Sequence, residues 1–318
     1  GLGNHLMTDV CGFVLALMSN RTVFVSSNHA TNSRVRRDHA YLYPPSVVVN
    51  ESRLTEAHRK QLGHYNAIPT DSSWSCFDVG HYVQSKDAVI GINDLLYAPM
   101  VYVNPHTAAF CREKFGLHAT YFLSNYFSRL HPNAIQEARR ILDRIPRDEH
   151  VLGMHVRYHR AGQYYSHGLN STLPTVFEEI RRRGGGGRIA LATDNMELLN
   201  AMKARFGRRL VTSNAIRGPD KDHFSAMIDM ALVEGCDDIV VTVRSTYSYM
   251  IASRFGRAGW VIEKESAHAF PTANSQSMGI SMLYHHKDHC DWRTNDRVEY
   301  CGEEHRGDLE YFFRYLVL

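Results

Sequence analysis

The second half of the chain alternates short apolar runs with amphipathic stretches in a regular order. Residues 151–156 are almost wholly apolar, which is typical of a strand buried on both faces. The stretches between successive apolar runs carry helical periodicity. The predicted strands are 151–156, 188–192, 209–212, 238–243 and 259–263, and the predicted helices are 173–183, 196–206, 224–234 and 246–255. This alternation predicts right-handed crossovers and a parallel, Rossmann-like sheet.

The first half is less regular. Apolar residues recur at helical spacing over residues 6–18, and residues 22–26 predict a buried strand. Residues 28–100 are rich in His, Asn, Ser, Tyr and Pro, which is typical of long loops that carry function or cover a cleft. The pattern is helical from residue 102 through 121–130 and again over 132–145, with Pro132 in a first turn. Residues 146–150 predict a hinge between two domains, 1–148 and 149–318, the C-terminal segment of the second packing back on the first.

Composition indicates a globular protein with room for two cores. The chain has 318 residues, of which 44% are hydrophobic and 22% are charged. Lys plus Arg number 36 against 33 Asp plus Glu, and this weak excess does not indicate a nucleic-acid partner. The longest apolar run, residues 10–18, is about half of what a bilayer span requires.

Cysteines and glycosylation sequons bear on the compartment. The six cysteines include no C-x-x-C pair, which argues against zinc and thioredoxin-like sites, and their even number fits disulfides, with Cys290 and Cys301 as the favoured pair. Sequons begin at Asn20, Asn50 and Asn170, which favours a glycoprotein of a secretory lumen. The chain opens abruptly on a glycine motif, so we expect the targeting segment to lie upstream of this sequence.

Polar residues follow the predicted strands directly. Arg157, Asp194 and Ser245 come at or just after strand ends, so they are expected at the carboxyl edge of the sheet, where ligands of open α/β sheets bind. A guanidinium there matches phosphate oxygens, and the helix that begins after Ser245 offers backbone N–H groups to an anion. The simpler alternatives are a surface ion pair for Arg157 and helix caps for Asp194 and Ser245.

A glycine pair precedes the first predicted helix. Gly1-x-Gly3-Asn4 would let the backbone approach a ligand held across a cleft. It is not a dinucleotide fingerprint, because the third glycine is missing. The sequence also has no P-loop, no G-x-S-x-G elbow and no H-E-x-x-H motif, so hydrolase and kinase functions lose their usual support.

Six segments in consistent order span nearly the whole chain. They are Gly1-Leu-Gly-Asn4, residues 12–25, Tyr126-Phe-Ser-Arg-Leu-His-Pro-Asn133, His155-Val-Arg157, Leu191-Ala-Thr-Asp194 and Val241-Thr-Val-Arg-Ser-Thr-Tyr247. Taken together, these segments resemble the GDP-fucose-dependent fucosyltransferase superfamily, most closely the plant xyloglucan α1,2-fucosyltransferase type and more distantly the α1,6 and protein O-fucosyltransferases.

The resemblance implies a GT-B α/β fold of two Rossmann-like domains facing a cleft, with GDP-fucose held by the carboxyl half. It implies that Arg157 grips the β-phosphate, that His155 touches the nucleotide, and that Asp229 contacts the guanine edge, a solvated helix position being the alternative for Asp229. It further implies an inverting transfer without a metal or other cofactor. The predicted donor-binding residues are Gly1, Gly3, Asn4, His155, Arg157, Asp194, Asn195, Asp229, Ser245, Thr246 and Tyr247.

The general base and the acceptor are left open. Tyr165 stands where the α1,6 branch has a glutamate. Asp38, His39 and His159 are the candidate bases, and catalysis without a strong base is the alternative. The expected acceptor is an oligosaccharide or polysaccharide, with α1,2 linkage favoured, in glycan or cell-wall biosynthesis. The resemblance places the protein in the Golgi lumen as a type II membrane protein whose anchor is outside this chain, and a homodimer is one option. The alternatives are a GDP-sugar-binding pseudoenzyme or lectin-like module, and a GT-B transferase using another nucleotide sugar.

Overall fold

The computed structural model divides the chain into two compact units, one of which is Leu130–Thr272. This unit begins before the predicted boundary at residue 148, because the helix α7 (Pro132–Leu142) packs on α10 (His223–Glu234). The described residues are 25–26, 48–49, 108–115, 124–125, 129–157, 169–213, 223–242, 245–256, 259–263 and 266–270. In the other unit they form the parallel pair β1 (Val25–Ser26) and β2 (Val48–Val49) and the helix α5 (Ala108–Phe115).

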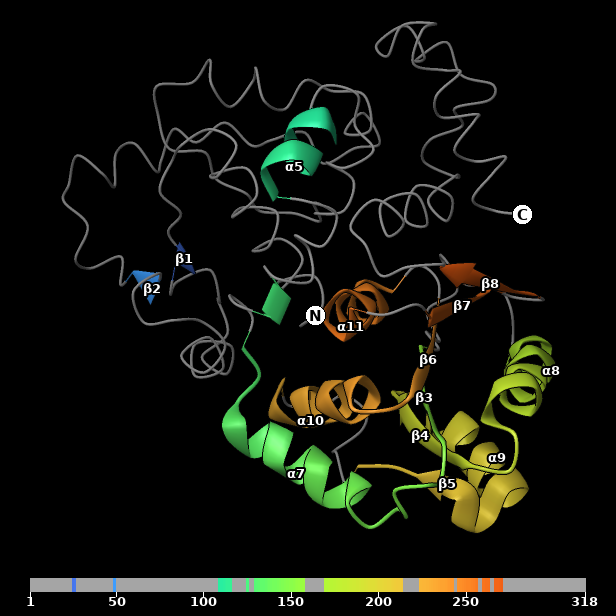
Figure 1. Ribbon diagram of the computed structural model, residues 1–318. Helices are drawn as coiled ribbons and strands as arrows, with labels where there is room; N and C mark the ends of the chain where they lie inside the picture. The colour runs from blue at the N-terminus through green and yellow to red at the C-terminus, as the bar shows by residue number, and fades with distance from the viewer. Residues whose placement is uncertain are drawn as a thin grey trace, which may run out of the picture. The chain divides into compact units, whose positions relative to one another are not determined.

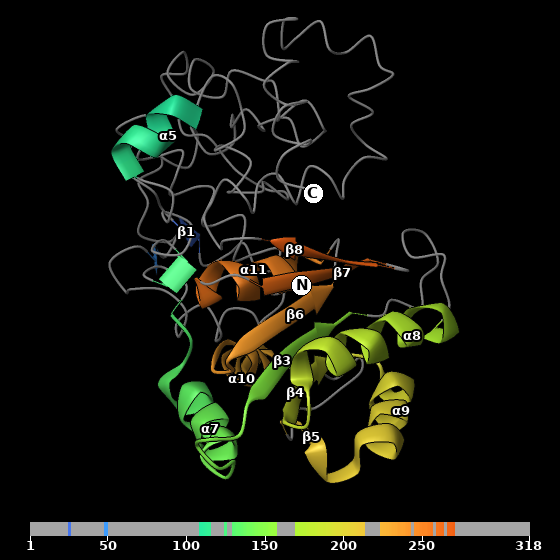
Figure 2. The ribbon, with the colours of Figure 1, turned by 45° about the vertical axis from the view of Figure 1, so that its right-hand side comes forward.

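The unit Leu130–Thr272 is built on a six-stranded sheet (Figures 1 and 2). Its strands are β3 (Val151–Val156), β4 (Arg188–Thr193), β5 (Leu210–Val211), β6 (Asp238–Thr242), β7 (Gly259–Glu263) and β8 (Ser266–Phe270). The spatial order is β5-β4-β3-β6-β7-β8, and every neighbouring pair is parallel except β7 with β8. The order of the parallel strands reverses between β3 and β6, which makes that point the topological switch point of a Rossmann-like sheet.

Helices cover both faces of this sheet, as the two ribbon views show. On one face, α8 (Leu169–Glu179) and α9 (Met196–Phe206) pack on Leu152, Met154 and Val156 of β3. On the other face, α7 and α10 pack on Val151 and Ala190, and α11 (Thr246–Phe255) lies against α10. Alternate residues of β3 therefore serve opposite cores, which explains why the strand is buried along its whole length and is apolar except for His155.

Gly153 allows α10 to approach the middle of the sheet closely. A Cβ atom added at Gly153 would lie 2.8 Å from the carbonyl oxygen of Val233, at the end of α10, and 3.0 Å from Cβ of Cys236. A backbone carbonyl cannot move aside easily, so this position has no room for a side chain. Cys236 is a buried thiol whose Sγ donates to the carbonyl of Leu232, so it is not part of a disulfide. The favoured disulfide pair, Cys290 and Cys301, lies outside the described residues.

Local signals in the sequence explain where the helices begin and end. Pro132 is at the first position of α7, and Nδ1 of His131 accepts from the Asn133 amide at 3.1 Å. Asn195 caps α9 in the same way. The helices α9 and α11 are followed by Gly207 and Gly256, both with positive φ, which glycine adopts without steric cost.

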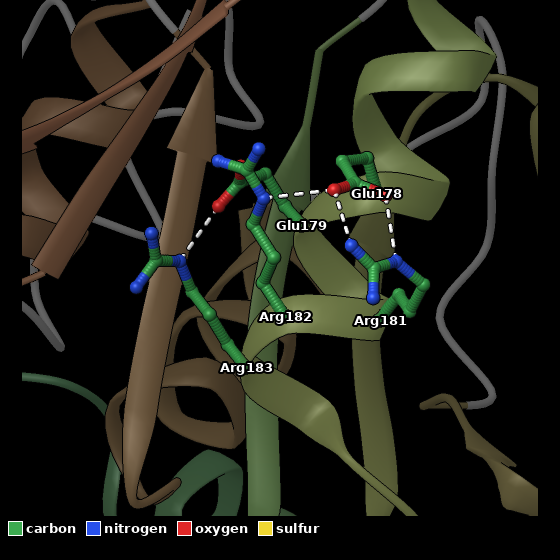
Figure 3. A network of polar contacts seen from close by, with 5 residues as sticks. All are labelled: Glu178, Glu179, Arg181, Arg182 and Arg183. Carbon is green, nitrogen blue, oxygen red and sulfur yellow. Dashed lines mark hydrogen bonds and ion pairs between the residues drawn. The ribbon is translucent and has the colours of Figure 1, made fainter.

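The predicted helix 173–183 differs from the structure at both ends. Helix α8 begins at Leu169, and after Glu179 the backbone widens into the π-helical turn η4 (Ile180–Gly184). Glu179 is buried and accepts from Nε of Arg183 at 2.6 Å, while the guanidinium of Arg183 stacks on the ring of Trp260 in β7. Figure 3 shows how Glu178 and Glu179 pair with the three arginines that follow them. These contacts tie the turn to the sheet.

Three further differences concern short elements. Residues 129–130 are not helical, so the predicted helix 121–130 ends earlier than expected. The strand β5 has two residues, fewer than predicted, and β8 was not predicted at all. Within the described ranges, no helix is long and apolar enough to cross a bilayer.

Candidate active site

The predicted site residues converge where the strand order reverses. Arg157 follows the last residue of β3, Asp194 follows β4, and Ser245 precedes α11, which β6 leads into. Because β3, β4 and β6 are parallel neighbours, their carboxyl ends share one edge of the sheet. The register confirms this, since His155 of β3 pairs with Ala192 of β4 and with Val241 of β6. The juxtaposition predicted from the strand pattern is therefore present.

Arg157 is held by its backbone and by its side chain. Its amide donates to Oγ1 of Thr242 at 2.9 Å, and the same hydroxyl donates to the carbonyl of His155 at 2.8 Å. Its Nη1 lies 3.1 Å from Oδ2 of Asp194, with 34% of the arginine side chain and 20% of the aspartate side chain exposed. The ion pair considered as an alternative for Arg157 is thus formed, and its partner is another predicted site residue. The ion pair with Asp194 uses one nitrogen of the guanidinium, and a guanidinium carries five N–H donors in all.

His155 is a buried residue of β3 that contacts α11. It is 4% exposed, and its Nδ1 lies 2.7 Å from Oγ of Ser248 in the first turn of α11. The ring also packs against Tyr247, with 4.7 Å between the ring centroids. The histidine is therefore fixed on two sides by α11. The motif His155-Val-Arg157 consequently delivers one buried imidazole and one partly exposed guanidinium to the same edge.

The first turn of α11 lies at the same edge of the sheet. Ser245 is the N-cap, because its Oγ accepts from the amide of Ser248 at 3.3 Å, so the cap predicted as the simpler alternative is present. A cap of this kind orders the first turn and does not use the amides of the residues directly after it, which can meet an anion. The Tyr247 hydroxyl donates to the carbonyl of Ala226 in α10, so it anchors α11 to α10.

Asp194 and Asn195 have different roles: one is a polar group at the edge of the sheet, and the other is a helix cap. The carboxylate of Asp194 pairs with Arg157, whereas Asn195 caps α9 by accepting from the Leu198 amide at 2.8 Å. Asn195 is 9% exposed, and its own amide donates to Oγ1 of Thr193. Asp194 is therefore a polar group of the site edge, and Asn195 stabilises the helix behind it.

Asp229 is buried in the middle of α10. It is 1% exposed, and the hydroxyl of Ser213, just beyond β5, donates to its Oδ1. The alternative of a solvated helix position is wrong. Ala226, which accepts from Tyr247, lies one helical turn before Asp229 on the same side of α10. The predicted contact with guanine stays a prediction.

Several predicted residues lie outside the described ranges, and other polar residues were missed. Thr242, Ser248 and Ser213 make the hydrogen bonds that fix His155, Arg157 and Asp229, and none of them was singled out. The one available signal was Thr242, a hydroxyl at the end of an otherwise apolar strand. For Thr246 the structure describes the backbone only. Those outside the described ranges are Gly1, Gly3, Asn4, Asp38, His39, His159 and Tyr165.

Comparison with known proteins identifies the fold. No protein-family model and no curated protein sequence matches the chain. The structure of Arabidopsis thaliana FUT1, a mutant in complex with GDP, matches with a TM-score of 0.59 and 14% identity over 84% of this chain and 69% of that chain. The NodZ α-1,6-fucosyltransferase co-crystallised with GDP matches with a TM-score of 0.56 and 13% identity over 85% of this chain and 94% of that chain. The predicted α/β class is confirmed, and the chain has the GT-B fold of these fucosyltransferase structures.

Proposed function

We propose that the chain is an inverting fucosyltransferase that moves L-fucose from GDP-fucose to a hydroxyl group of a glycan, with α1,2 linkage and without a metal. Two structures of the same fold were determined with GDP, which supports a guanine nucleotide as the donor's carrier. The sequence resemblance to the α1,2 branch supports the linkage. The Golgi lumen, as the compartment of a type II membrane protein, is part of this proposal.

The observation that carries the proposal is the position of Arg157. It lies at the switch point of the parallel sheet, where α/β proteins bind nucleotides, and follows by two residues His155, which contacts the first turn of α11. As the bond to fucose breaks, negative charge grows on the β-phosphate, and a guanidinium and helix-terminal amides held in place beforehand stabilise that charge where it develops. Asp194 holds the guanidinium at this edge through the ion pair at 3.1 Å.

The remaining roles follow from this placement. We assign His155 to the nucleotide, the amides of the first turn of α11 to the diphosphate, and Asp229 to the guanine edge, whose N1 and N2 both donate. Gly1, Gly3 and Asn4 would approach the donor from the first half of the chain. The acceptor is an oligosaccharide or polysaccharide, and one of Asp38, His39 and His159 would remove the proton of its hydroxyl.

The transfer assay uses the full chain with labelled GDP-fucose on a glycan array. We expect Arg157→Ala to lower transfer by roughly 100-fold, which corresponds to about 3 kcal/mol for the loss of one preorganised donor. Arg144→Ala is the matched control, because Arg144 is an exposed arginine on the loop that follows α7. Near-normal transfer by Arg157→Ala, with a glycan that the wild type fucosylates, would contradict the role of this residue.

The transfer assay repeated with a chelator tests whether transfer requires a metal. Asp220 and Asp222 have the Asp-x-Asp spacing of metal-dependent glycosyltransferases, and both lie outside the described residues. We expect full transfer in excess EDTA, because the positive charge comes from Arg157 and the α11 amides. Activity that disappears with EDTA and returns with Mn²⁺ would show that a divalent cation, rather than Arg157 and the α11 amides, supplies the positive charge.

The same assay separates the alternatives. A pseudoenzyme or lectin-like module would bind GDP without releasing it from GDP-fucose in the presence of any acceptor. A transferase for another donor would transfer no fucose in this assay and would bind another nucleotide, such as UDP, more tightly than GDP. The proposed function requires GDP release that depends on the acceptor, and inhibition by GDP but not by UDP.

A further inference from the structure

Two buried hydroxyl groups connect α11 and β6 to the end of β3. Oγ1 of Thr242 bridges the carbonyl of His155 and the amide of Arg157, and so continues the pairing of β3 with β6 through a side chain. Oγ of Ser248 lies 2.7 Å from Nδ1 of His155 and 3.2 Å from the amide nitrogen of Thr242. Both residues are buried, Thr242 at 6% exposed and Ser248 at 0%. Water therefore cannot substitute for these protein partners.

The protons of this network can be assigned from its donors and acceptors. The Thr242 amide can only donate, so Oγ of Ser248 is the acceptor in that hydrogen bond. The Ser248 hydroxyl then has one proton of its own, which needs an acceptor, and Nδ1 of His155 lies in hydrogen-bonding range. If Nδ1 instead carried a proton, Ser248 would accept twice and its own proton would be left unsatisfied in a buried place, which costs free energy. Nδ1 is therefore the acceptor.

We propose that Ser248 is a positioning residue that holds His155 as its neutral Nε2–H tautomer, so that the imidazole acts as a hydrogen-bond donor toward the nucleotide. The hydrogen bond at one ring nitrogen determines the proton on the other. Packing against Tyr247 fixes the plane of the same ring. The nucleotide as the group that His155 meets rests on the proposed function, whereas the tautomer rests on the hydrogen bonds alone.

Helix α11 itself supplies a matched control. Ser253 is in the same helix and 1% exposed, but its Oγ has no hydrogen-bond partner in the structure. Ser253→Ala and Ser248→Ala thus remove the same atom from buried positions of one helix, and only Ser248→Ala breaks hydrogen bonds to β3 and β6. A difference between the two variants therefore reports the hydrogen bonds rather than the loss of a hydroxyl from α11.

The tautomer is measured directly by two-bond ¹H–¹⁵N correlation spectra of the full chain labelled with ¹⁵N-histidine. The signals of His155 are those absent from His155→Gln. We expect the Nε2–H pattern in the wild type and in Ser253→Ala, and a changed pattern in Ser248→Ala. An Nδ1–H or doubly protonated pattern in the wild type overturns the proposal, and this result needs neither a variant nor any activity.

Nucleotide affinity supplies the second measurement. We expect Ser248→Ala to raise the Kd for GDP by roughly tenfold, as for the loss of one well-oriented hydrogen bond, and Ser253→Ala to leave it unchanged. If the wild type binds GDP and Ser248→Ala binds it equally well, Ser248 does not position His155 for the nucleotide. If the wild type shows the Nε2–H tautomer but binds no GDP, the proposed function fails while the tautomer assignment stands.

Discussion

Arg157 is held in place by contacts within the protein. Its amide is fixed by Thr242 and its guanidinium by Asp194, and both partners belong to strands next to β3 or to the loops that follow them. Orientation of this kind matters because a preorganised donor stabilises developing charge without reorganising during the reaction. At this position the shape of the cation should therefore matter as well as its charge.

The expected consequence is that lysine does not replace this arginine. Lys keeps the charge at residue 157 but lacks the planar fork that can pair with Asp194 and a phosphate oxygen together. We expect Arg157→Lys to lower kcat by roughly tenfold or more, with the fold intact by circular dichroism. Arg144→Lys, at an exposed position outside the site, should retain wild-type kcat. A wild-type kcat for Arg157→Lys would mean that charge alone suffices.

Some residues of the site were predictable from the sequence and others were not. Arg157 was predictable because it directly follows a strand whose apolar residues identify it, and Asp194 was predictable for the same reason. Ser248 was not, because its partner His155 is 93 positions away and a serine three residues after a cap looks the same whether it faces water or a histidine. Asp229 was predicted by resemblance, yet its partner Ser213 carried no signal of its own.

At the scale of elements, burial on both faces made the parallel strands predictable. Helix α9 and strands β3 and β7 have the predicted bounds, because apolar pattern, caps and terminal glycines agree there. The π-helical turn η4 was missed because Arg181, Arg182 and Arg183 are good helix formers, while the widening depends on tertiary contacts with Glu179 and Trp260. The antiparallel strand β8 was missed because the strand–helix alternation ends before it.

A buried ion pair connects α10 and α11, and it gives a prediction about pH. Nε of Arg254 lies 2.6 Å from Oε1 of Glu234, with 6% and 14% of the two side chains exposed. Burial raises the pKa of the Glu234 carboxyl above its usual 4.5, although Arg254 acts in the opposite direction. Between 4.5 and this raised pKa the folded chain binds more protons than the unfolded chain, so the contribution of Glu234 to stability is largest below pH 4.5 and is lost as the pH rises through the raised pKa.

Glu234→Gln tests this sign, because glutamine keeps the shape and an acceptor for Arg254 but does not titrate. In urea unfolding, the variant and the wild type should be equally stable below pH 4.5, and the variant should be the more stable at pH 7. Glu178→Gln is the contrast, because its exposed pairs with Arg181 and Arg182 lower the pKa of Glu178 to about 2. There the wild type should be slightly more stable at pH 7 and lose this advantage as the pH falls toward 2. A wild type more stable than Glu234→Gln at pH 7 would mean that the attraction of Arg254 outweighs burial.

At the scale of the whole molecule, topology is retained where sequence is not. Only 14% of aligned residues are identical to FUT1, yet the fold extends over 84% of this chain. The order β5-β4-β3-β6-β7 fixes one switch point, and that point fixes where a cation on the end of β3 meets the first turn of α11. The site needs few defined residues, because the sheet supplies most of its geometry.

Binding of the proposed nucleotide should therefore stabilise the whole protein, and the stabilisation should depend on the residues at this edge of the sheet. GDP at 100 times its Kd should add about 2.7 kcal/mol to the free energy of unfolding and raise the Tm by a few degrees. UDP at the same concentration should raise it much less, because uracil offers one ring donor where guanine offers N1 and N2 to a carboxylate such as Asp229. Thermal melts of the full chain measure both, with Arg144→Ala expected to behave as the wild type and Arg157→Ala to lose most of the shift with GDP. Equal shifts with GDP and UDP would rule out the guanine contact. A full shift in Arg157→Ala would mean that the nucleotide does not bind at the end of β3.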